Sequence, residues 1–242
     1  MLRVVNPDNA ILPVLRVDPE GHVKEVLGAA FFFSERPLIL SARHVLKVEP
    51  GPGEAIVVPS RRPPDAEPGV AKPLPQMALL QNVRACPDYD LAVAEVPDVT
   101  HFEYLPIRHD EPAANVRTYD LVSQETLEAT APGKPPARTL NPYVWKGYVH
   151  HVIVTQEFAL GMHAPGKIIE VSIPVAKGMS GAPLVDEATL RVVGVVLGNR
   201  TRPLVPAPQA ASEEQQWYLP IGRALHWSHV REFLESIGEA AP

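Results

Sequence analysis

The chain has 242 residues, of which 45% are hydrophobic and 21% charged, a composition ordinary for a globular protein that buries a core. Its 28 acidic residues outnumber its 22 basic ones, and the formal charge of −6 argues against DNA or RNA binding. The 28 prolines and 15 glycines favour short strands separated by turns over long helices, so composition predicts an all-β protein.

The first third of the chain alternates apolar runs with turns. Residues 14–17 and 23–33 predict a β-hairpin that turns at Asp18-Pro19-Glu20-Gly21, and residues 56–58 and 77–83 predict later strands. No apolar run approaches membrane-spanning length, and the first residues lack the apolar core of a signal peptide, so we expect no membrane association.

Three segments rich in proline interrupt these runs, at residues 59–76, 129–142 and 202–214. The first is either a surface insertion ordered by its prolines or a loop that binds a partner, and the insertion is the preferred interpretation.

A histidine and an aspartate lie beside predicted strands in the first half of the chain. His44 closes the run Ser41-Ala42-Arg43-His44, which follows the strand-like residues 37–40. Asp90 directly precedes the apolar run Leu91-Ala92-Val93-Ala94. We therefore expect both side chains at the ends of strands.

A serine in a glycine-rich turn lies further along the chain. The run Lys177-Gly178-Met179-Ser180-Gly181-Ala182-Pro183 joins the strand-like residues 168–173 to the strand-like residues 190–197. Such a turn either holds out a nucleophile or is an ordinary hairpin loop. An activated serine needs a base, and the base needs an acid that orients it. His44 and Asp90 are candidates for these roles, and the chain order is His, Asp, Ser.

The pattern changes to helical spacing near the C-terminus. Apolar residues recur on one helical face from Ala224 and Gly238 ends the segment, so we expect a helix that packs on the sheet. The apolar positions are Leu225, Val230, Phe233, Leu234 and Ile237.

Together these segments resemble the trypsin-like serine proteases, in the single-chain bacterial form similar to the HtrA protease domain. The family motifs Thr-Ala-Ala-His, Asp-Ile-Ala-Leu and Gly-x-Ser-Gly-Gly-Pro correspond to runs that end at His44, begin at Asp90 and surround Ser180. Asp88 competes with Asp90, but only Asp90 directly precedes the apolar run, as the family pattern requires. Flanking strands also match: Gly28-Ala29-Ala30-Phe31, Val193-Gly194-Val195-Val196 and Tyr218-Leu219-Pro220-Ile221.

The resemblance implies a chymotrypsin-like fold of two antiparallel six-stranded β-barrels with a C-terminal α-helix. It implies one protease unit in which residues 1–112 carry His44 and Asp90, and residues 113–242 carry Ser180. These three residues would form a catalytic triad that cleaves peptide bonds through an acyl-enzyme, with the backbone amides of Gly178 and Ser180 as the oxyanion hole. No metal or other cofactor is expected.

Three departures from the family pattern bear on activity. Met179 stands where digestive relatives carry an aspartate that pairs with a newly cut N-terminus, so that activation route is closed. Arg43 replaces a small residue, and Leu197 falls where many relatives place a serine. Both changes bear on catalytic strength.

Substrate specificity is expected from a pocket beside the oxyanion loop, residues 177–181. The residues just before this loop would form the base of the pocket, and residues 197–199 would form one wall. These substrate-binding residues are Pro174, Val175, Ala176, Leu197, Gly198 and Asn199. None of them is acidic, and a buried cation would lose water without gaining a partner, so we expect small or apolar P1 side chains.

The single cysteine, Cys86, can form no internal disulfide, which favours a reducing compartment and the cytoplasm.

The expected partner is a protein or peptide substrate, and a regulatory protein partner is left open. The competing function is a protease fold that has lost turnover and docks a protein. An α/β-hydrolase esterase is disfavoured because its motif and its chain order of Ser, Asp and His differ.

Overall fold

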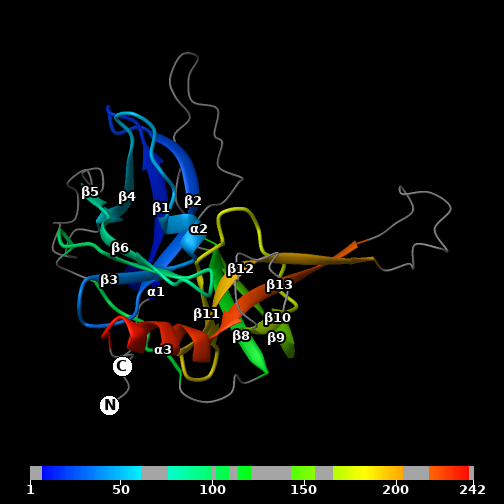
Figure 1. Ribbon diagram of the computed structural model, residues 1–242. Coiled ribbons are helices and arrows are strands. Elements are labelled where there is room, and N and C mark those ends of the chain that lie inside the picture. The colour runs from blue at the N-terminus through cyan, green and yellow to red at the C-terminus, as the bar shows by residue number, and fades with distance from the viewer. Residues whose placement is uncertain are drawn as a thin grey trace, which may run out of the picture.

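A computed structural model describes residues 7–60, 76–99, 102–108, 114–120, 143–155, 166–203 and 218–239. It consists mostly of strands arranged in a curled N-terminal sheet, a C-terminal barrel and a final helix (Figure 1). The expected all-β fold of the chymotrypsin type with a C-terminal helix is confirmed. The three proline-rich segments, including residues 59–76 with their expected surface insertion, lie almost entirely outside the described residues.

The N-terminal sheet has seven antiparallel strands in the order β5-β4-β1-β2-β3-β7-β6. The strands are β1 (Ile11–Val17), β2 (Val23–Phe32), β3 (Leu38–Ser41), β4 (Ala55–Ser60), β5 (Gln76–Leu79), β6 (Gln81–Ala85) and β7 (Ala92–Glu95). Two short helices accompany them, α1 (Pro7–Ala10) and α2 (Arg43–Leu46).

The two edge strands of this sheet, β5 and β6, are consecutive in the chain. Only Leu80 separates them, and its N–H still donates to the Ile56 carbonyl of β4 at 3.4 Å. Asn82 has a φ of +48°, and the pairing of β6 with β7 shifts between Gln81 and Arg84. The strand expected over residues 77–83 is therefore bent into two pieces, so the unit has seven strands where the resemblance implied six. They form a curled half-barrel, whereas the resemblance implied a closed barrel.

The C-terminal unit is a closed barrel of six antiparallel strands, as the resemblance implied. Their order is β10-β13-β12-β11-β8-β9. The strands are β8 (Asn115–Asp120), β9 (Tyr143–Thr155), β10 (Gly166–Val171), β11 (Pro183–Asp186), β12 (Val192–Pro203) and β13 (Tyr218–His226). All strands of the sheet precede residue 96 and all strands of the barrel follow residue 114, while the division at residue 112 stays a prediction.

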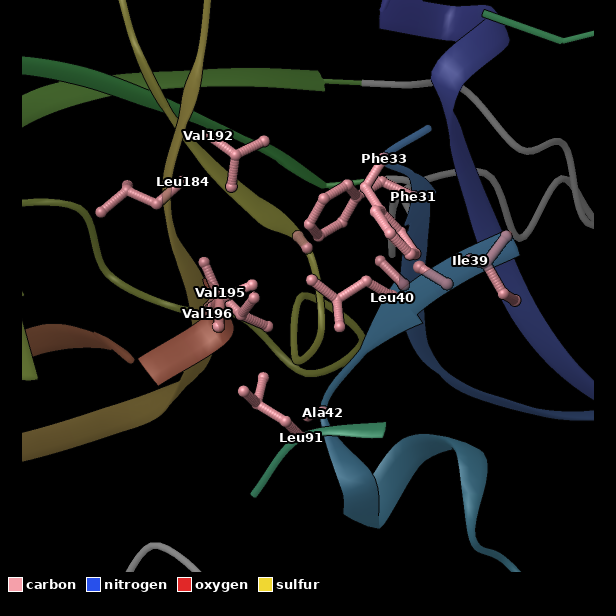
Figure 2. Close-up of a cluster of buried hydrophobic side chains, with 14 of the residues drawn as sticks. Phe31, Phe33, Ile39, Leu40, Ala42, Leu91, Leu184, Val192, Val195 and Val196 are labelled. Carbon is pink, nitrogen blue, oxygen red and sulfur yellow. The ribbon is translucent and has the colours of Figure 1, made fainter. Parts of the chain in front are cut away.

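One hydrophobic core runs through both units (Figure 2). Phe31 and Leu40 of the sheet, and Phe33 directly after β2, lie in the same buried cluster as Leu184 and Val195 of the barrel. Burial of apolar area is the main stabilising term in such contacts. The core therefore fixes the sheet, which carries His44 and Asp90, against the barrel that carries Ser180.

The C-terminal helix α3 (Trp227–Ser236) starts three residues later than the apolar spacing predicted. Ala224 and Leu225 continue β13, where they pair with β12 and β10, and the His226 side chain caps the helix by accepting the Ser228 N–H. None of the helices in the described ranges is long and apolar enough to cross a membrane.

Although α3 follows the barrel, its end is fastened to the N-terminal sheet. Glu239 is buried and accepts hydrogen bonds from Arg36 at 2.7 Å and from Arg84 at 2.9 Å. The His229 ring lies 4.2 Å from the Tyr89 ring, measured between centroids, and Tyr89 directly precedes Asp90. The helix thus packs behind the loop that holds Asp90.

We expect the packing of His229 to make stability depend on pH. Its Nε2 accepts the Lys167 N–H at 2.8 Å, which requires an unprotonated nitrogen, and burial lowers the pKa of His229 in the folded protein despite the opposing effect of Glu232. The unfolded chain therefore binds a proton more readily, and stability should fall as pH drops below about 6.5. Thermal unfolding of the wild type and His229→Gln between pH 5 and 7.5 checks this. His150→Gln, at an exposed site, is the control, and an equal slope in all three proteins would contradict the expectation.

Candidate active site

His44 and Asp90 form a two-point contact. The His44 Nδ1 lies 2.6 Å from Asp90 Oδ2, and the His44 backbone N–H donates to Asp90 Oδ1 at 3.0 Å. The Asp90 side chain is 6% exposed, whereas the His44 side chain is 48% exposed. A buried carboxylate therefore holds the ring through one nitrogen and leaves the other free to act as a base. The competing Asp88 is exposed.

Local structure explains why these two residues meet. β3 ends at Ser41, and the single turn of α2 places His44 beside the loop that enters β7. Arg43 Nη1 donates to the Cys86 carbonyl at 3.0 Å, which ties α2 to the start of that loop. Arg43, a departure from the family pattern, thus connects the segments that carry His44 and Asp90.

Ser180 lies on the loop between β10 and β11. The Met179 N–H donates to the Ala176 carbonyl at 3.1 Å, and Gly178 has a φ of +97°, as the third residue of a type II turn requires. The Ser180 hydroxyl donates to the Leu197 carbonyl at 3.1 Å, and the described residues show no hydrogen bond between Ser180 Oγ and His44. In this state the hydroxyl is held by β12.

The Ser180 loop rests directly on the segment that leads to His44. The Ser180 carbonyl accepts the Ala29 N–H at 2.8 Å, and the buried Ser41 hydroxyl donates to the Ala29 carbonyl at 2.6 Å. A Cβ on Gly28 would lie 2.5 Å from the Ser180 carbonyl oxygen. Glycine at this position allows the two backbones to approach and brings the three predicted triad residues into one region.

Gly181 is expected to be the residue of this loop least tolerant of a methyl group. Its φ is +86°, and an added Cβ would lie 2.0 Å from Ser41 Oγ and 2.2 Å from the Ala29 carbonyl oxygen. Gly181→Ala should therefore destabilise the protein by roughly 2 to 4 kcal/mol, through backbone strain and overpacking. Urea unfolding measures this change. Gly198→Ala is the matched control, because a Cβ there would meet nothing within 4 Å, and equal stability of both variants would contradict the prediction.

Two backbone amides of the loop have no acceptor in the part of the chain that the structure describes. Neither the Gly178 N–H nor the Ser180 N–H donates to any atom of the described residues, and Gly178 is buried. These two groups are therefore available to an oxygen atom of a ligand, and they are the amides predicted as the oxyanion hole.

The predicted substrate-binding residues form two segments beside Ser180. Leu197 lies in a bulge of β12, where the pairing with β13 shifts between Val196 and Gly198. The Asn199 side chain reaches from β12 to the backbone of Val175, which joins the two segments. The nearby Glu170 is buried and paired with Arg223 at 2.9 Å, so that acid is already neutralised.

Three interactions of the site were not predicted from the sequence. They are the hydroxyl of Ser41 on Ala29, the guanidinium of Arg43 on Cys86 and the carbonyl of Leu197 on Ser180. Ser41 and Arg43 lie in the histidine motif, but their partners are distant in the chain. Motif spacing therefore carries no signal for these contacts.

The family follows from a comparison with known domains. The sequence pattern of the trypsin-like peptidase domain matches residues 28–195. The chain belongs to this family. Its members are serine protease hydrolases, and the predicted resemblance is confirmed. No curated protein matches the sequence of this protease.

Solved structures agree with the family at the level of the fold. The active form of the Rv3671c protease from M. tuberculosis has a TM-score of 0.58 at 18% identity, covering 97% of this chain and 83% of that one. The HtrA-type protease AlgW with a decapeptide has a TM-score of 0.62 at 16% identity, covering 95% and 64%. A serine endoprotease from Yersinia pestis has a TM-score of 0.55 at 16% identity, covering 95% and 62%. The protease thus spans under two thirds of these last two structures.

Proposed function

We propose that the protein is a serine endopeptidase that acts through His44, Asp90 and Ser180. The observation that carries the proposal is the pair of hydrogen bonds from His44 to the two carboxylate oxygens of Asp90. Beside them lies a serine loop with two amides that have no acceptor among the described residues. In this mechanism the Ser180 hydroxyl leaves the Leu197 carbonyl and attacks the peptide carbonyl carbon, and His44 Nε2 accepts its proton.

In the remaining steps of the catalytic cycle, the backbone amides stabilise the oxyanion and His44 transfers protons. The amides of Gly178 and Ser180 donate to the oxyanion that forms, a contribution worth about 3 to 4 kcal/mol for one donor in this type of site. His44 then gives its proton to the leaving amine as the C–N bond breaks. His44 then takes a proton from water, which attacks the acyl carbon, and returns that proton to Ser180 Oγ as the C–Oγ bond breaks. No metal or other cofactor takes part.

We infer that the P1 side chain enters between residues 174–176 and residues 197–199. A Cβ on Gly198 would meet nothing within 4 Å, so there is open space beside this wall. The Val175 side chain packs on Gly222 of β13, where an added Cβ would lie 3.1 Å from it. Among the described residues of these two segments there is no carboxylate, and the neighbouring Glu170 is paired with Arg223, which favours small or apolar P1 side chains. The single cysteine favours action in the cytoplasm, on a protein or peptide substrate.

A fluorophosphonate probe tests the proposal, because it reacts with a serine only where a base and an oxyanion hole are assembled. Intact mass should show one adduct on the wild type, and peptide mapping should place it on Ser180. His44→Ala should remain unlabelled, whereas His22→Ala, at an exposed hairpin turn, should label like the wild type. An unlabelled wild type, or an adduct on another residue, would refute the proposed mechanism.

A further inference from the structure

The oxyanion loop, which carries the amides of Gly178 and Ser180, is preceded by Val175. The side chain of Asn199 forms hydrogen bonds with the backbone of Val175. The Val175 N–H donates to Asn199 Oδ1 at 2.7 Å, and Asn199 Nδ2 donates to the Val175 carbonyl at 2.5 Å. A carboxamide offers one acceptor and one donor group at a fixed separation, so both backbone groups of Val175 are satisfied by one side chain. Among the described residues, Val175 has no other hydrogen-bond partner.

A second contact closes the segment on itself. The Met179 side chain is fully buried, and its Sδ accepts the Ala176 N–H at 3.0 Å, while the Ala176 carbonyl accepts the Met179 N–H at 3.1 Å. Met179 cannot form an ion pair with a newly cut N-terminus. Its thioether instead connects the residue before Ser180 to the residue after Val175.

The other end of the segment is held by backbone contacts. The Gly181 N–H donates to the Val196 carbonyl at 2.7 Å, and the Ser180 carbonyl accepts the Ala29 N–H at 2.8 Å. Between these fixed points lie the two unpaired amides of Gly178 and Ser180. The upstream anchor on Val175 depends on a side chain, so a single substitution can remove it without changing the backbone sequence of the loop.

We propose that Asn199 is a positioning residue, which holds the oxyanion loop in its working geometry from within the chain. The loop is then ordered without a cleaved N-terminus or a partner protein. The inference rests on the proposed function, since it concerns the same serine and the same two amides. Oxyanion donors act at 2.7 to 3.1 Å, and a displacement of about 1 Å in such a site costs about a hundredfold in rate.

The test uses a peptide diphenyl phosphonate with alanine at P1, which modifies the active serine and places an oxygen in the oxyanion hole. Its maximal inactivation rate, kinact, and its half-saturating concentration, KI, separate chemistry from binding. Asn199→Ala should lower kinact about a hundredfold and leave KI within about twofold. Asn199→Asp keeps the acceptor for the Val175 N–H and loses the donor, so its kinact should lie between those of Asn199→Ala and the wild type. Asn115→Ala, an exposed asparagine of β8, is the control and should match the wild type.

An unchanged kinact in Asn199→Ala would overturn the inference. A rise in KI alone would overturn it as well, because Asn199 would then contact the ligand and not position the loop. If Asn199→Ala unfolds, a kinact of Asn199→Asp equal to the wild type overturns the inference. If the wild type reacts with neither the phosphonate nor the fluorophosphonate, the proposed function is refuted. Failure of the proposed function is therefore seen in the wild type, whereas failure of the inference is seen in the Asn199 variants.

Discussion

Turnover is expected to fall about a million-fold when Ser180 is replaced with alanine, a magnitude typical of Ser-His-Asp proteases. The substitution removes the one oxygen that can attack the substrate next to His44, and water must then act without covalent help. Two other sulfur or oxygen groups near the described site, Cys86 and Ser41, are no replacement. Cys86 is buried, burial raises the pKa of its thiol, and Ser41 donates its proton to the Ala29 carbonyl.

The fold should survive this change, since Ser180→Ala loses one hydrogen bond, to the Leu197 carbonyl. Hydrolysis of a fluorogenic peptide with an apolar P1 residue and the melting temperature would be measured together. Ser34→Ala, after β2, is the control and should keep full activity. Activity of Ser180→Ala above about one per cent of the wild type would assign the chemistry to another residue.

The second large effect is expected for Asp90→Asn, which should lower kcat/KM about 10⁴-fold, again the magnitude typical of this class of triad. Asp90 accepts from the His44 backbone N–H through Oδ1 and from Nδ1 through Oδ2. An asparagine that keeps its oxygen on the backbone N–H turns its NH₂ group toward Nδ1. Nδ1 must then be the acceptor, so the ring carries its proton on Nε2 and cannot take the proton of Ser180.

The measurement is kcat/KM for the same peptide, with the fluorophosphonate labelling rate as an independent readout. Asp88→Asn changes the neighbouring exposed carboxylate and should retain near wild-type values. The melting temperature of Asp90→Asn should stay close to that of the wild type, because the asparagine is nearly the same size. Equal losses in Asp88→Asn and Asp90→Asn would show that net charge and not the His44 contact matters.

Departures from the family pattern illustrate how tertiary contacts change the meaning of a residue. The sequence suggested that Arg43 and Leu197 bear on catalytic strength. In the structure, Arg43 connects α2 to the loop before Asp90, and the backbone of Leu197 holds the Ser180 hydroxyl. The role of Arg43 depends on the long side chain by which it departs from the motif, whereas the role of Leu197 uses its backbone carbonyl and is independent of the missing hydroxyl.

Motifs along the chain were enough to predict the family, the all-β fold, the C-terminal helix and the three candidate catalytic residues. These features are local: a histidine after a strand, an aspartate before an apolar run and a serine in a glycine turn each depend on a few adjacent residues. The spacing of apolar residues likewise predicted α3 and the first hairpin, because burial on one face imposes that period.

Tertiary structure alone decided how those pieces are held together. Four contacts join segments distant in the chain: Leu80 with β4, Gly181 with Ser41, Asn199 with Val175, and the ring of His229 with that of Tyr89. Each contact depends on where two backbone segments approach each other after the core has formed. Composition and periodicity do not predict such long-range contacts. The sequence therefore determined which groups can perform the chemistry, and the packed core determined whether their atoms are close enough to do so.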